Sequence, residues 1–227
     1  MGQADSTCWT VLRGAAIGDG ESREAFAARY TPLIRAYLAA RWRDSPLLQE
    51  LDDAAQDVFI ECLKQGGVLQ RADPGRPGGF RAFLYGLVRN VALRVEQARA
   101  RGRERLLSDV DRSVGDGVAQ ESLSHVFDRA WAKAVMREAA DRQAERAERE
   151  GEASLRRVEL LRLRFQDGLP IREIARLWAA DPAALHREYS RARDEFKAAL
   201  LEVMAFYHPG SPAEAERESA ELLGLLV

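Results

Sequence analysis

Apolar residues recur every three or four positions along most of the chain, which is the spacing of helices that bury one face. No segment shows the convincing alternation of apolar and polar residues that a half-buried strand requires. The pattern therefore predicts an all-α fold. In the first half, three apolar stripes predict three helices: Phe26, Tyr30, Leu33, Ile34, Tyr37, Leu38 and Trp42; Leu48, Leu51, Ala55, Val58, Phe59, Cys62 and Leu63; and Phe80, Phe83, Leu84, Leu87, Val88, Val91 and Val95.

Capping and helix-breaking residues indicate where these helices begin and end. Ser45 followed by Pro46 is typical of a helix N-cap with proline in the first turn. The glycines and prolines of 65–79 predict a loop, and the polar, aperiodic stretch 107–121 predicts a linker between domains. The glycines within residues 1–22 predict a flexible lead-in.

A long helix is expected after the linker, beginning near Leu123. Its apolar stripe continues for three turns, to Val135. Beyond Met136 the sequence is charged on all sides and poor in large apolar groups. This half is predicted to be a solvated helix held by Glu–Arg pairs, each worth about 0.2–0.5 kcal/mol.

A second compact unit is predicted over residues 154–207, in the form of a helix-turn-helix. A helix with Leu155, Val158, Leu161 and Phe165 inward precedes a short helix 171–178. A tight turn, 179–182, leads into a longer helix, 183–206, which Asp181 can cap. The residues expected to bury the helix pair are Ile171, Ile174, Ala175, Trp178, Leu185, Tyr189, Ala192 and Phe196.

The last segment has a capping-box spacing at Ser211–Glu214, which opens a short helix. Its terminal leucines are expected to bury against the 123–135 stripe or the helix-turn-helix unit, since so short a helix is marginal alone. They are Leu222, Leu223, Leu225 and Leu226. The predicted domain organisation is a lead-in at 1–22, a helical domain at 23–106, a linker with a long helix at 107–153, the helix-turn-helix domain at 154–207 and a C-terminal extension at 208–227.

Charge is segregated along a chain whose net charge is only −2. The stretch 44–57 carries five acids and no base, whereas 78–106 carries seven arginines against two glutamates. An arginine-rich helix suits a phosphate backbone, because each neutralised phosphate releases counterions. An acidic amphipathic helix suits a basic protein surface instead. The acids are Asp44, Glu50, Asp52, Asp53 and Asp57.

The exposed side of the second helix of the helix-turn-helix is also basic. His186, Arg187, Ser190, Arg191 and Arg193 are residue types that contact major-groove edges or phosphates. Glu188 lies among them, and it either accepts a hydrogen bond from cytosine or pairs within the protein.

Enzyme chemistry finds no support in the sequence. Cys8 and Cys62 lack metal-ligand spacing, and the three histidines lie far apart on different elements. Glycine-rich phosphate loops and nucleophile elbows are absent. We therefore expect no catalytic residues, no metal and no cofactor. The sequence opens without a secretory signal and contains no run of about 18 apolar residues, so a soluble, cytoplasmic protein that does not enter a membrane is expected.

Four segments, in order, resemble the sigma-70 family of bacterial RNA polymerase sigma factors, specifically its extracytoplasmic-function (ECF) group. FAARYTPLIRAYLAARW is similar to the first helix of the promoter-melting domain, and DDAAQDVFIECL to its polymerase-binding helix. FRAFLYGLVRNVALRVEQARARGR resembles the helix that reads the minus-ten element. LLRLRFQDGLPIREIA with the later SRAR resembles the domain that reads the minus-thirty-five element. Together the segments and the helix-turn-helix cover roughly two thirds of the chain.

The resemblance implies three sets of contact residues. Docking on the clamp coiled coil of core RNA polymerase falls to Asp52, Asp53, Gln56 and Asp57. Minus-ten contacts fall to Phe83, Arg89, Asn90, Arg94, Arg99 and Arg101. Promoter contacts of the helix-turn-helix fall to Ala184, His186, Arg187, Ser190, Arg191 and Arg193. The group also implies an anti-sigma factor as a further partner.

The chain departs from the family pattern at three places. Ala179-Ala180-Asp181-Pro182 forms the turn that usually carries a glycine, Glu188 stands where a basic residue is common, and Arg94 where an acid is frequent. Two other functions stay open on the residues alone. One is a helix-turn-helix regulator that acts without polymerase, which co-purification with core polymerase would separate from a sigma factor. The other is a helical interaction protein with no nucleic-acid role. A binding profile on promoter DNA that does not change with salt would favour this second function.

Overall fold

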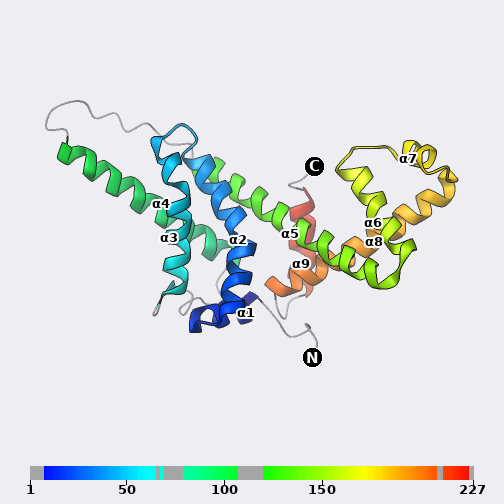
Figure 1. Cartoon of the computed structure of the whole chain (residues 1–227), viewed down its shortest axis with the longest axis horizontal. Helices are drawn as coiled ribbons and strands as arrows, with labels where there is room; N and C mark the ends of the chain where they lie inside the picture. Colours follow the sequence, from blue (N-terminus) through cyan, green and yellow to red (C-terminus); the bar gives the residue numbers. More distant parts are fainter. Residues whose placement is uncertain (1–7, 65–66, 69–78, 107–119, 209–211, 225–227) are drawn as a thin grey trace. The chain divides into compact units, whose positions relative to one another are not determined.

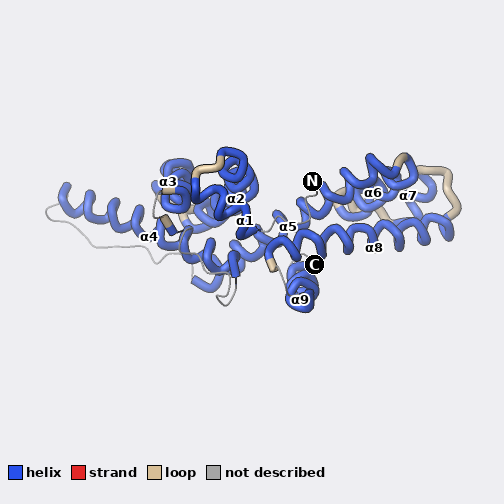
Figure 2. The backbone as a smooth tube through the Cα atoms, turned by 90° about the horizontal axis from the view of Figure 1, so that it is seen from below, coloured by secondary structure: helices blue, strands red, loops and turns tan. Residues whose placement is uncertain are grey.

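The computed structural model describes residues 8–64, 67–68, 79–106, 120–208 and 212–224. The chain has an all-α fold, as the apolar spacing predicted, and the described part contains no strand (Figure 1, Figure 2). Its elements are α1 (Cys8–Ile17), α2 (Gly20–Arg41), the 3-10 helix η2 (Pro46–Glu50), α3 (Leu51–Leu63), α4 (Gly79–Leu106), α5 (Gln120–Glu150), α6 (Glu152–Phe165), α7 (Ile171–Leu177), α8 (Pro182–Tyr207) and α9 (Pro212–Gly224). Most of the predicted loop 65–79 and linker 107–121 lies outside the described residues.

Residue contacts divide the chain into two compact units. Unit 1 contains the chain up to Ala134 with 206–209 and 222–227, and unit 2 contains 135–205 and 210–221. The boundary lies inside α5, so a helix that was expected to belong to a linker contributes to both units.

Unit 1 is built around α2, which contacts α1, α3 and α4. The capping prediction at Ser45 is confirmed, because its hydroxyl accepts from the Leu47 N–H at 3.2 Å. The expected flexible lead-in is wrong over its described part, which forms α1 and the start of α2. Leu12 and Ala15 are buried, since a helix of nearly three turns with small and apolar residues on one side can pack against α2.

The N-terminal half of α5 belongs to the same core. Trp131 is 2% exposed, and its ring centroid lies 4.8 Å from that of Tyr207 and 6.3 Å from those of Tyr30 and Phe80. Aromatic pairs at these separations stabilise the folded state by more than the burial of their apolar area alone. This segment is therefore a structural member of unit 1.

A half-buried charge network joins the end of α2 to α4. Glu96 accepts from Arg41 Nε at 2.6 Å and from Trp42 Nε1 at 2.8 Å. Burial raises the pKa of the Glu96 carboxyl, but the hydrogen bonds from Arg41 and Trp42 outweigh it, so its pKa lies below the usual 4.5. The bonded carboxylate therefore stabilises the folded state.

We expect Glu96→Gln to destabilise the protein by about 1–3 kcal/mol at neutral pH, because it removes a charged acceptor and leaves Arg41 without its partner. A carboxyl with a lowered folded-state pKa stabilises above its unfolded pKa and loses this contribution as pH falls. The difference between wild type and variant in denaturant titrations should therefore shrink below about pH 4.5. Glu145→Gln, at an exposed position of α5, is the control and should change stability by less than about 0.5 kcal/mol. An unchanged difference at low pH would contradict the assignment.

Unit 2 has a small core between α6, α7 and the start of α8. Its buried residues are Leu160, Leu163, Ile171, Ile174, Ala175 and Leu185, with Leu169, Trp178 and Tyr189 packed against them. The inward face predicted for α6 is partly wrong, because Leu155 and Phe165 are 42% and 68% exposed. The α6 residues in this core are Leu160 and Leu163, so Leu155, near the start of α6, lies outside it, and Phe165 projects from another side of the helix than Leu163.

The prediction of a fully solvated second half of α5 is also wrong. Ala139, Gln143 and Ala147 are buried at i, i+4 and i+8, and Gln143 Nε2 donates to the Ala192 carbonyl at 3.1 Å. Alanine is small and only weakly apolar, so alanines do not mark a buried face in the sequence. Their small side chains nevertheless let two helices approach closely. The expected intrahelical pairing does occur, with Arg142 bonded to Glu138 at 3.1 Å.

The C-terminal extension forms α9, in which Ala215, Ser219 and Leu222 are buried. Burial of these positions supports the expectation that the helix packs within the chain. Ser211, Leu225 and Leu226 lie outside the described residues. No described helix is long and apolar enough to cross a membrane.

Candidate nucleic-acid and protein interfaces

The outer face of α3 carries the residues predicted to dock on polymerase. Asp53, Gln56 and Asp57 are exposed at i, i+3 and i+4, opposite the buried face formed by Leu51, Ala54, Ala55, Val58 and Cys62. Among the described residues, Asp53 and Asp57 form no ion pair. These two carboxylates therefore remain available to a partner.

Asp52 differs from these two acids, because it is paired with Arg35 of α2. It is the fourth residue assigned to the docking set, and docking through it would have to displace this intramolecular pair. Exposed pairs of this kind contribute about 0–1 kcal/mol. Docking through Asp52 would therefore cost about 0–1 kcal/mol for the loss of its pair with Arg35.

The acidic and basic helices, expected to face different partners, are partly paired with each other. Arg94 of α4 bonds Glu61 of α3 at 2.9 Å, and Arg99 pairs with Glu50 at the α3 N-terminus. Hydrogen bonds from Lys64 and then from Arg94 lower the pKa of Glu61. Two of the arginines predicted to contact the minus-ten element thus have intramolecular partners, because α3 and α4 lie side by side (Figure 1).

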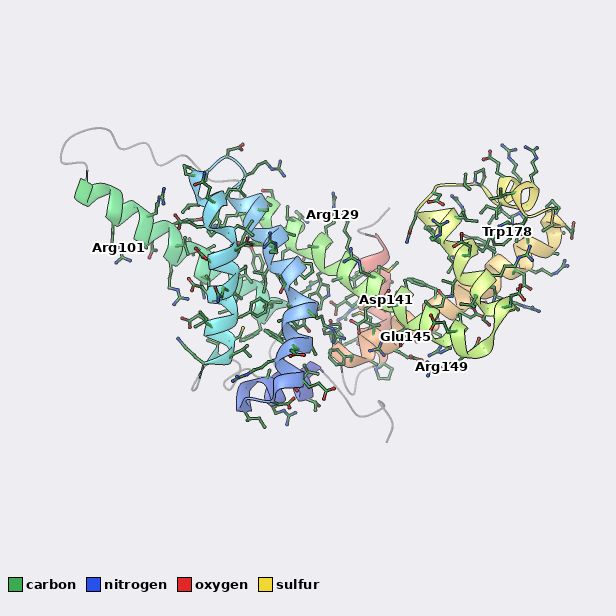
Figure 3. All side chains as sticks on the ribbon, in the orientation of Figure 1. Arg101, Arg129, Asp141, Glu145, Arg149 and Trp178 are labelled. Carbon is green, nitrogen blue, oxygen red and sulfur yellow. The ribbon has the colours of Figure 1, made fainter. Side chains whose placement is uncertain are left out.

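The other residues predicted for the minus-ten element are spread over α4. Asn90 and Arg101 are exposed, and Arg101 lies near the C-terminal end of α4 (Figure 3). Phe83 is half-buried, with its ring 5.9 Å from that of Phe80. Arg89 is half-buried, and its Nε has no hydrogen-bond partner among the described residues. Asn90, Arg94 and Arg101 share one face, since they are spaced by four and seven residues.

The cap and the turn predicted for the helix-turn-helix are present, whereas Trp178, Tyr189 and Phe196, predicted to be buried, are half-buried. The Asp181 carboxylate accepts from the Ala184 N–H at 2.8 Å, with Pro182 as the first residue of α8. Ala179 has φ of 49°, a left-handed conformation that favours glycine. The alanine thus occupies a strained position of the turn.

The face of α8 predicted to read DNA is open to solvent. His186, Arg187, Ser190 and Arg193 are exposed, and Ala184 is half-buried. Arg191 is exposed but bonds Glu188 at 3.0 Å.

Glu188 is an intramolecular partner, which decides between its two interpretations. It accepts from Arg191 of its own helix and from Arg157 of α6 at 3.4 Å. Arg157 also bonds Glu195, at 2.8 Å. The carboxylate therefore orients arginines on two helices.

Three exposed residues at these surfaces escaped the sequence analysis. Ile60, 52% exposed, continues the spacing of Asp53 and Asp57 on α3. Arg172 and Arg176 are exposed one turn apart on α7, where the first helix of such a pair approaches the phosphate backbone. Their i, i+4 spacing within the predicted short helix was the available signal.

No protein-family model matches the chain, and no curated protein is significantly similar to it.

Proposed function

We propose that the protein is an ECF-type sigma factor, which binds core RNA polymerase and directs it to specific promoters. The observation that carries the proposal is the pair of exposed surfaces that one chain presents. One is the carboxylate face of α3 in unit 1, and the other is the basic face of α8 in unit 2. A DNA-binding protein alone needs only the second surface.

Each surface matches the chemistry of its proposed partner. Asp53 and Asp57, with Ile60 beside them, suit a helical protein surface that offers bases around an apolar residue. Arg187 and His186 lie in the first two turns of α8, the part of a recognition helix that reaches base edges. Asn90 on α4 is an exposed amide able to bond an extruded base, and extrusion costs a few kcal/mol. The proposal includes a cytoplasmic location and an anti-sigma factor as a further partner.

Transcription in vitro tests the proposal directly. Core polymerase supplied with this protein should initiate at discrete positions on a genomic library, and core polymerase alone should not. DNA binding without binding to core polymerase would favour the regulator instead. Binding to neither would favour an interaction protein.

Arg187 allows base reading to be separated from phosphate contact. If Arg187 reads a base, Arg187→Ala should weaken binding to a cognate upstream duplex by about 1–3 kcal/mol and spare a scrambled duplex. If it contacts phosphate, both duplexes should weaken alike and the salt dependence should fall by about one unit. The measurement is a titration of both duplexes at several salt concentrations. An unchanged affinity for both would mean that this face of α8 does not meet DNA.

A further inference from the structure

The exposed side of the first half of α5 is a run of basic side chains. His125, Arg129 and Lys133 follow each other at i, i+4 and i+8, and all three are exposed. Figure 3 shows Arg129 projecting away from the α5 ribbon. We call these three residues the α5 basic stripe. All of them belong to unit 1.

The stripe lacks the ion pairs that Arg142 and Arg146 form in the second half of the helix. No ion pair involves Arg129 or Lys133 among the described residues, and the nearby Asp128 faces Arg81 at 3.7 Å. Like charges at i and i+4 destabilise a helix by a few tenths of a kcal/mol. In the second half of α5, by contrast, Arg142 stands four residues from Glu138 and bonds it. The stripe thus has a repulsion that nothing in the described chain relieves.

Packing does not account for the stripe either. The opposite side of the same turns contains Phe127 and Trp131, which are buried in the core of unit 1. The helix is therefore fixed by one face and holds the basic face outward. A rigid helix with outward cations is preorganised for a polyanion, because no segment must become ordered on binding.

We propose that the α5 basic stripe binds the phosphate backbone of duplex DNA, as a contact separate from α4 and α8. Successive members are about 6 Å apart along the helix axis, whereas each DNA strand has a phosphate about every 3.4 Å along its axis. Arg129 and Lys133 can thus address different phosphates, and the His125 ring can donate a hydrogen bond to a third. As promoter DNA is the intended duplex, the inference rests on the proposed function. The stripe adds affinity and not sequence preference, since phosphate contacts position a protein without specifying bases.

The test is the salt dependence of duplex binding by the full chain. Arg129→Gln with Lys133→Gln should lower the slope of log K against log salt by about 1.8, because two phosphate contacts are lost. The matched control is Arg142→Gln with Arg149→Gln, which removes the same charge from the second half of α5 and should leave the slope within error. Circular dichroism should show both variants as helical as the wild type.

Every result decides the matter. An unchanged slope in the stripe variant overturns the inference, and so does an equal fall in the control, which would make net charge the cause. Failure of the wild type to bind duplex at low salt overturns it as well. Binding to core polymerase is measured separately, so loss of the proposed function is distinguishable. If the protein does not bind polymerase but the slope changes in the stripe variant, the stripe binds DNA and the protein is not a sigma factor.

Discussion

Reversing both free carboxylates on α3, by Asp53→Arg with Asp57→Arg, should reduce the affinity for core RNA polymerase by at least 100-fold. Both side chains are exposed and unpaired among the described residues, so a basic partner surface would meet two new like charges. Such juxtaposition costs several kcal/mol. Stability should change by only about 1 kcal/mol, because both side chains are exposed and only Asp53, in the first turn of α3, interacts with the helix dipole.

Binding is measured with immobilised core polymerase, and helicity by circular dichroism. The control is Glu24→Arg with Asp141→Arg, which reverses two exposed acids on other helices. It should bind polymerase as the wild type does. Full binding by the Asp53/Asp57 variant with unchanged helicity would remove α3 from the interface.

The largest expected effect on stability comes from Trp131→Ala. Trp131 is 2% exposed among Tyr30, Phe80 and Tyr207, and truncation of a buried tryptophan costs about 3–5 kcal/mol. For a chain of this size the melting temperature of unit 1 should fall by about 10 °C. A linker helix, as the sequence suggested, would show almost no change.

Arg137→Ala is the control for this measurement, because it truncates an exposed side chain on the same helix. It should change stability by less than about 0.5 kcal/mol. A Trp131→Ala protein that melts with the wild type would mean that α5 lies outside the core of unit 1.

The candidate surfaces were predictable where local rules decide exposure. The face with Asp53 and Asp57 follows from the amphipathic period of α3, and the α8 face with Arg187 follows from the cap at Asp181. Ion pairing between different helices was not predictable, because partners such as Arg94 and Glu61 are 33 residues apart. Which acid meets which base depends on how α3 and α4 pack, and no local pattern contains that information. For Glu188 the sequence left two roles open, a contact with cytosine or a pair within the protein, because its partner Arg157 is 31 residues away on α6.

The sequence by itself determined the helices, their caps and the helix-turn-helix, since these depend on residues within a few positions of each other. For α5 and α6, tertiary structure alone decided which faces were covered. It placed Trp131 in a core and buried Ala139, Gln143 and Ala147. It also left Leu155 and Phe165 exposed, because the α6 residues in the core with α7 are Leu160 and Leu163. A period shows that one face of a helix is apolar, but burial requires a neighbour of the right length and distance, and only the folded chain supplies one.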